Sequence, residues 1–125
     1  MSPAASLWAG RILSVLLVGV LTMSAIMKFV QPAGFAGGMA HIGIPLTLVP
    51  APGVLELACT AIYAFPRTAV LGAILLTSDM GGAMMTHVRV GDPFIAQFLL
   101  SAMVWGGLYF RDARVRALIP LRTGA

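Results

Sequence analysis

Long apolar runs, separated by short polar or proline-containing breaks, dominate the hydropathy pattern of this chain. Three of them, residues 12–30, 68–86 and 94–110, approach the roughly 20 apolar residues that an α-helix needs to cross a bilayer. A fourth run, residues 48–65, is flanked by prolines, and its uninterrupted part reaches only about 20 Å at about 1.5 Å per residue. The pattern predicts an all-α fold: an integral membrane four-helix bundle with a short, Pro-flanked second span.

The composition supports the interpretation as a membrane protein and argues against some classes of binding partner. Hydrophobic residues make up 59% of the 125 residues and charged residues only 10%, so we expect one transmembrane domain, residues 1–125, surrounded by a lipid bilayer. The basic residues stand singly without an interleaved aromatic patch, so we expect no nucleic-acid partner. The single cysteine, Cys59, allows no internal disulfide and no multi-cysteine metal motif, and we expect no metal site.

The basic residues are distributed unequally between the two ends of the predicted helices. Only Lys28 and Arg89 lie on one side, whereas the other side carries a set of arginines: Arg11, Arg67, Arg111, Arg114, Arg116 and Arg122. The positive-inside rule therefore predicts that both termini lie in the cytoplasm. On the outer side, residues 31–52 are rich in Gly and Pro and contain no charged residue, which predicts a loop or a re-entrant cap.

This threading gathers most acidic residues and both histidines in the outer half of the molecule. Ionisable groups at membrane depth cost a few kcal/mol each, so they normally face a protein interior or a watery cavity and find partners. We therefore expect an outer-half polar pocket for a small lipophilic ligand. Its candidate catalytic residues are Asp79, Glu56 and His87, and its candidate ligand-binding residues are Lys28, Arg89, His41, Tyr63, Thr86 and Gln97.

Several of these residues also have a purely structural interpretation. Lys28 lies at a helix end and either joins the pocket or extends to the lipid headgroups. Glu56 shares a helical stripe with Tyr63, but the positive N-terminal end of its helix would also stabilise it. Asp79 lies well inside its run, where a carboxylate cannot easily reach water, so a paired or functional role is favoured.

Two further patterns have local explanations. The segment VGDP is typical of a turn, in which Gly91 takes positive φ, Asp92 caps the next helix and Pro93 begins it. Small residues at i+4 spacing, at positions 73, 77 and 81 and at positions 78 and 82, predict close helix approach within the chain or in a homo-oligomer.

From residue 11 to residue 122 the chain resembles the DoxX-like family of small four-span bacterial membrane proteins. The segments that carry the resemblance are LLTSDMGGAMMTHVRVGDPF, GVLELACTAIYAFPRTAVLGAILLT, SAIMKF and AHIGIP. The positions typical of the family are Ser24, Lys28, His41, Gly53, Glu56, Pro66, Arg67, Thr86, His87, Arg89, Gly91, Asp92 and Pro93. Asp79 departs from the pattern, because relatives tend to carry an aromatic residue there.

The resemblance leaves three functional hypotheses. Relatives named DoxX and DoxD are linked to quinone-reducing thiosulfate oxidation and to membrane oxidoreductase complexes. This implies a subunit of a quinone-linked or other membrane oxidoreductase system, with an oxidoreductase partner subunit and a quinone as the candidate cofactor. The second hypothesis is a stand-alone enzyme in which Asp79 or Glu56 performs acid–base catalysis on a lipophilic metabolite such as an epoxide. The third is a non-enzymatic binder or transporter component for a small hydrophobic molecule.

Overall fold

The computed structural model describes residues 1–123, and helices account for 80% of the chain, with no strand in the described part. Four helices are long: α1 (Pro3–Val30), α3 (Pro50–Ala64), α4 (Ala69–Arg89) and α5 (Ile95–Arg111). The connecting segments add short helices: α2 (Phe35–Ile42), η1 (Leu46–Leu48), η2 (Pro66–Thr68) and α6 (Ala113–Arg116). The all-α prediction is therefore confirmed.

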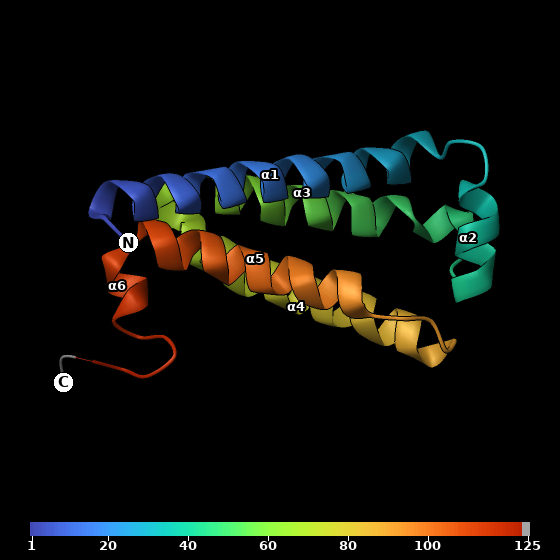
Figure 1. The fold of residues 1–125 in the computed structure, drawn as a ribbon. Helices are drawn as coiled ribbons and strands as arrows, with labels where there is room; N and C mark the ends of the chain where they lie inside the picture. The colour runs from blue at the N-terminus through green and yellow to red at the C-terminus, as the bar shows by residue number, and fades with distance from the viewer. Residues whose placement is uncertain (124–125) are drawn as a thin grey trace.

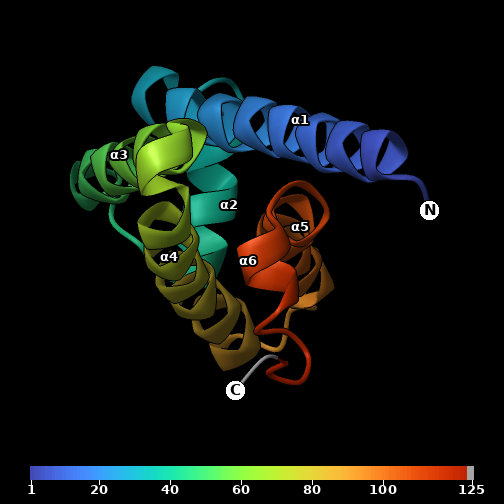
Figure 2. The same ribbon diagram turned by 90° about the vertical axis from the view of Figure 1, so that its left-hand side faces the viewer.

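The four long helices form two pairs that diverge from one another. α1 packs against α3 and α5, and α4 packs against the same two helices, so the four surround a common axis (Figure 2). The pair α1 and α3 meets the pair α4 and α5 near the N-terminus and α6, and the two pairs separate toward α2 (Figure 1). We call this arrangement the wedge, with a closed end at α6 and an open end at α2.

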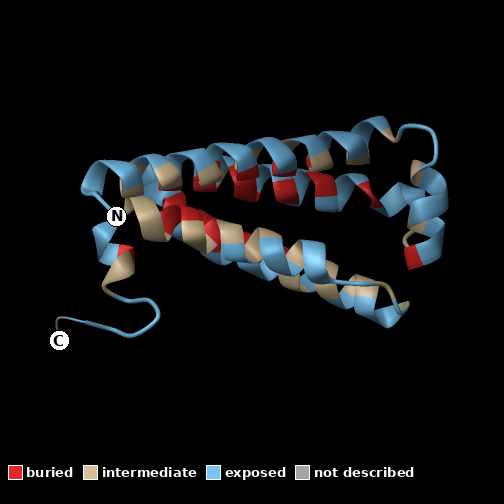
Figure 3. Cartoon of the chain, viewed as in Figure 1, coloured by how far each residue is buried: buried red, intermediate tan, exposed pale blue. Residues whose placement is uncertain are grey.

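Glycines allow the backbones to meet at the closed end. A Cβ atom on Gly72 of α4 would lie 2.3 Å from the backbone nitrogen of Tyr63 on α3, and one on Gly10 of α1 would lie 2.7 Å from the carbonyl oxygen of Gly107 on α5. Both distances are too short for any side chain. Most of the buried residues also lie toward this end, as Figure 3 shows. The closed end therefore contains most of the core.

Local sequence explains where the first helix begins and ends. The Ser2 side chain accepts a hydrogen bond from the backbone nitrogen of Ala5, and Pro3 occupies the first turn, where its missing N–H costs nothing. Gln31 ends α1 in a left-handed conformation with φ of 51°. The helix thus begins nine residues before the predicted residue 12, because the cap at Ser2 and not the charge at Arg11 defines its start.

The predicted outer loop contains a helix of its own. α2 starts after Gly34 and ends at Gly43, and both glycines have positive φ, at 87° and 77°. Helix α3 begins at Pro50 and ends before Pro66, in agreement with a short, Pro-flanked segment. The glycines and prolines of the loop therefore delimit short helices instead of preventing them.

Three helical stretches of the described chain are long and apolar enough to cross a bilayer: Pro3–Val30, Leu46–Ala64 and Pro66–Arg89. Large apolar side chains also face outward, for example Val15 at 71% exposure and Leu55 at 54%, as expected of surfaces that contact lipid. Helix α5 has 17 residues, about 26 Å at about 1.5 Å per residue, and is not among the three. The expectation of four spans therefore stays a prediction.

Candidate functional site

A cavity of about 670 Å³ lies between the two helix pairs at the open end of the wedge. We call it the outer cavity. Apolar side chains from all four long helices and from α2 form most of its wall. Its polar lining is small: Ser24, Lys28, Glu56, Asp79, Thr86, His87 and Gln97. An apolar cavity of this size with a few polar groups is typical of a small-molecule site.

An ion pair between α1 and α3 is the main polar feature of the outer cavity. The Lys28 Nζ donates to Oε2 of Glu56 at 2.5 Å and to the Ser24 hydroxyl at 2.9 Å. Glu56 is only 4% exposed. A Cβ on Gly53, one turn before Glu56, would lie 3.1 Å from the Lys28 Cβ, so this glycine allows the two helices to approach. Lys28 thus turns inward to an ion pair instead of extending to the headgroups.

Asp79 of α4 lines the same cavity without a charged partner. Among residues 1–123, the ion pairs are Lys28–Glu56, His41–Asp92 and Arg114–Asp112, and none includes Asp79. Its side chain is partly buried and borders the cavity. A carboxyl group in such a place is available to a ligand as an acceptor when ionised and as a donor when protonated.

His87 presents one ring nitrogen for further bonding. Its Nδ1 lies 2.8 Å from the Ala83 carbonyl oxygen, and because a carbonyl only accepts, Nδ1 carries the proton and donates. In the neutral ring, Nε2 is then an acceptor. Thr86, beside it, donates its hydroxyl proton to the Gly82 carbonyl oxygen at 2.9 Å.

Three buried polar atoms of α5 have no hydrogen-bond partner in the described chain. One is Nε of Arg111 at the last residue of the helix. The other two are Oε1 of Gln97, which lines the outer cavity, and the hydroxyl oxygen of Ser101 one turn further along the helix. A buried polar group without a partner costs about 1–3 kcal/mol. A ligand with a hydroxyl or an N–H group would remove that cost at Gln97.

Two polar contacts hold α2 against the end of α4 and the turn after it. The Nη2 of Arg89 donates to the Ile42 carbonyl oxygen, and Nε2 of His41 lies 2.9 Å from Oδ1 of Asp92. His41 and Arg89 therefore do not line the outer cavity but fix the helix that covers it. Gly91 has a φ of 80°, which confirms the predicted turn.

The predicted cap at Asp92 is wrong. Helix α5 begins at Ile95, its N-cap residue is Phe94, and no side chain caps it. Asp92 instead pairs with His41, a residue more than fifty positions earlier in the sequence. Local turn chemistry gave no sign of this long-range partner.

Tyr63 lies away from the outer cavity, near the closed end. Its hydroxyl donates to the Val104 carbonyl oxygen at 2.8 Å and lies 3.3 Å from the Ser14 hydroxyl, and its side chain is fully buried. Seven residues separate it from Glu56, which is about 10 Å along a helix. The shared helical face was identified correctly, but the cavity does not extend that far along it.

The polar residues of the cavity all fall within a segment that matches a known protein family. The model of the DoxX-like family matches residues 12–108, which include every polar residue that lines the outer cavity. The chain belongs to the DoxX-like family. No curated protein and no solved structure matches it. It is a DoxX-like membrane protein.

The cavity of this DoxX-like protein also uses residues that sequence reasoning missed. Met39 and Ile42 of α2 and Ile44 after it form part of the wall. Met39 and Ile42 are three residues apart and so share one helical face, but the surrounding glycines indicated a loop. The small-residue stripes of α4 were assigned to helix packing, yet a Cβ on Gly81 or Gly82 would meet nothing within 4 Å.

Proposed function

We propose that this DoxX-like protein binds a small lipophilic molecule with a polar head in the outer cavity, as a subunit of a quinone-linked or other membrane oxidoreductase system. The observation that carries the proposal is the Lys28–Glu56 ion pair in a mostly apolar cavity open between helices suited to a bilayer. A ligand of this kind reaches the cavity from the lipid, and the polar groups fix its orientation.

The donors and acceptors of the cavity fit a quinone. The third N–H of Lys28 has only a long contact, 3.5 Å to the Ser24 carbonyl oxygen, and would donate to a quinone oxygen. Oε1 of Gln97 and Nε2 of His87 would accept from the hydroxyls of the reduced form. A bound quinone supplies two-electron redox chemistry, and an oxidoreductase partner subunit would exchange the electrons. The chain's own contribution is to bind and orient the head group and to exclude water.

A cavity-filling variant tests the proposal. Ala83 lines the outer cavity, whereas Ala96 of α5 is exposed and does not. We expect Ala83→Phe to weaken the binding of a short-chain ubiquinone at least about tenfold, since a substitution that fills the site removes the ligand's apolar contacts. Ala96→Phe should leave binding unchanged. Tryptophan fluorescence quenching in detergent measures binding, and equal affinity of both variants would disprove the quinone site.

A specific observation also favours an acid–base enzyme: Asp79 borders the cavity without an ion-pair partner in the described chain. On this second proposal, Asp79 or Glu56 transfers a proton to or from a lipophilic substrate such as an epoxide. The purified chain alone would then turn over substrate, and Asp79→Asn or Glu56→Gln would abolish turnover while Ala96→Phe would not. A redox subunit would show no such turnover and would co-purify with a partner or a quinone.

We further propose four spans in the bacterial inner membrane, with both termini in the cytoplasm. The excess of arginine at the closed end supports this orientation by the positive-inside rule. In a Cys59→Ala background, a membrane-impermeant thiol reagent added outside should label Val90→Cys but not Arg67→Cys. The reverse labelling would overturn the orientation. Gly81 leaves open space on α4, where a second copy of the chain would pack in a homo-oligomer.

A further inference from the structure

A second cavity, of about 410 Å³, lies at the closed end of the wedge. It is independent of the outer cavity and of the function proposed for it. Trp8 and Arg11 of α1 and Arg111 of α5 line it, together with the side chains of Ser14 and Tyr63. We call it the arginine cavity, because two guanidinium groups border one space.

Neither guanidinium of the arginine cavity is neutralised by a carboxylate in the described chain. The three ion pairs of residues 1–123 involve other residues, and Nε of Arg111 is buried without a hydrogen-bond partner. Instead, Arg11 lies 5.4 Å over the ring of Trp8, and Arg111 lies 5.4 Å over the ring of Tyr63. The aromatic rings position both cations at the cavity.

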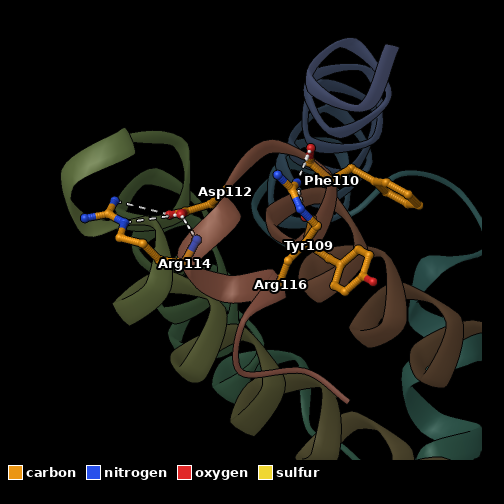
Figure 4. Close-up of polar contacts among 5 residues, drawn as sticks. All are labelled: Tyr109, Phe110, Asp112, Arg114 and Arg116. Carbon is orange, nitrogen blue, oxygen red and sulfur yellow. Dashed lines mark hydrogen bonds and ion pairs between the residues drawn. The ribbon is translucent and has the colours of Figure 1, made fainter. Parts of the chain in front are cut away.

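The neighbouring arginines are already engaged, as Figure 4 shows. Arg114 donates to the Asp112 carboxylate, and Arg116 donates to the carbonyl oxygens of Tyr109 and Phe110 at 2.8 and 2.9 Å. Arg116 therefore satisfies backbone acceptors at the end of α5, where a helix leaves carbonyls unpaired. Arg114 and Arg116 are thus engaged by groups of the chain itself, unlike the two arginines that border the arginine cavity.

The remaining wall of the arginine cavity is apolar and continuous with the lipid-facing surface. Val15 and Val18 of α1 line it, and Val15 is 71% exposed. Trp8, which is 59% exposed, has the position typical of aromatic residues at a membrane–water interface. The cavity therefore combines two guanidinium groups with an apolar exit along α1.

We propose that the arginine cavity binds the phosphate group of an anionic phospholipid. Arg11 and Arg111 contact the phosphate, since planar guanidinium groups match phosphate oxygens in paired hydrogen bonds. An acyl chain lies along Val15 and Val18. Two uncompensated cations favour a lipid with net negative charge over a zwitterionic one, whose own cation would approach them.

Lipid-dependent stability of the full chain tests this site. In neutral detergent, dioleoylphosphatidylglycerol should raise the Tm saturably, whereas dioleoylphosphatidylcholine and inorganic phosphate should not. Arg11→Gln with Arg111→Gln should raise the half-saturating phosphatidylglycerol concentration by roughly a hundredfold, about tenfold for each charged hydrogen-bond donor removed. The matched control is Arg67→Gln with Arg122→Gln, which removes two exposed positive charges outside the arginine cavity and should change the concentration less than about twofold.

Each other outcome overturns the site. An equal loss in the control pair would mean that diffuse surface charge attracts the lipid, and equal stabilisation by phosphatidylcholine would remove the role of charge. Stabilisation by inorganic phosphate alone would mean a free-anion site without a lipid. If the double glutamine variant does not fold, Arg11→Lys with Arg111→Lys keeps both charges but loses the paired geometry, and affinity should still fall roughly tenfold. Unchanged affinity there would contradict the proposal.

Discussion

Removing Lys28 alone from the Lys28–Glu56 pair should cost more stability than removing both partners. The Nζ and Oε2 atoms are 2.5 Å apart, so at an effective dielectric constant of about 20 their attraction is about 6–7 kcal/mol. Desolvation of the two ions, several kcal/mol each, offsets most of it. Lys28→Met leaves the buried Glu56 carboxylate with this cost and no counter-ion. We therefore expect a loss of about 3 kcal/mol in the free energy of unfolding.

Substitution of the carboxylate partner, Glu56, should cost less stability than substitution of Lys28. Glu56→Gln keeps an oxygen that accepts from Lys28, and the lysine side chain, 23% exposed, reaches water, so we expect a loss of about 1 kcal/mol. The double variant carries no charge at either position and should lose only about 1–2 kcal/mol. The coupling free energy between the two positions is then about 2–3 kcal/mol, well above the roughly 0.5 kcal/mol scatter of independent sites.

Equilibrium unfolding by SDS in mixed micelles, followed by circular dichroism, measures these values. Asp112→Asn is the control, because it neutralises a paired carboxylate in the C-terminal segment and should be additive with Lys28→Met to within about 0.5 kcal/mol. Coupling between Lys28 and Glu56 below that limit would refute the reasoning. So would a smaller loss in Lys28→Met than in Glu56→Gln.

Three further predictions concern the closed end and the C-terminal segment. Gly72→Ala places a Cβ 2.3 Å from the Tyr63 backbone nitrogen and should cost about 3 kcal/mol or more in the SDS titration. Gly81→Ala meets nothing within 4 Å and should gain up to about 1 kcal/mol, and similar effects of both variants would contradict the close contact. Tyr63→Phe removes a buried hydroxyl with a 2.8 Å hydrogen bond and should cost about 1–2 kcal/mol in the same titration; no loss would speak against that bond. The hydrogen bond from Arg114 lowers the pKa of Asp112. The stability that this carboxylate contributes is therefore complete above its unfolded pKa of about 3.9 and is lost as the pH falls through its folded pKa. Hydrogen-exchange protection of α6 should therefore decrease in acid below about pH 3.9, and Asp112→Asn should lack this acid step.

The hydropathy pattern predicted most of the helices but not how they are arranged. Apolar runs and prolines located α3, α4 and α5 to within a few residues, because membrane helices must satisfy their backbone internally over a minimum length. The divergence of the two pairs depends on tertiary contacts at Gly10, Gly72 and Gly107, which have no periodic signature. The sequence did not predict helix α2, because the glycines in and around it are typical of a loop. Two of them, Gly34 and Gly43, instead flank the helix with positive φ, one before its start and one after its end.

For the candidate site, too, the sequence predicted which residues gather but not how the chain arranges them in space. Glu56, Asp79, Thr86, His87 and Gln97 all line the outer cavity, because ionisable and polar groups at membrane depth gather where they can be satisfied. Tyr63 lies on the same helical face as Glu56 but about two turns further from the open end. Periodicity predicts which face of a helix a residue occupies, but it does not predict how far a cavity extends along that face. The His41–Asp92 pair joins segments far apart in sequence, and no local pattern predicts such a contact.

The position of the tight glycine contacts separates what holds this protein together from what it recognises. Helix crossings at Gly10, Gly72 and Gly107 fix the fold at one end, whereas a residue such as Asp79 borders space at the other and supports little of the core. Substitutions there change the chemistry offered to a ligand at small cost in folding. Such a scaffold can vary the group that it presents at position 79 while the glycine crossings keep its architecture constant.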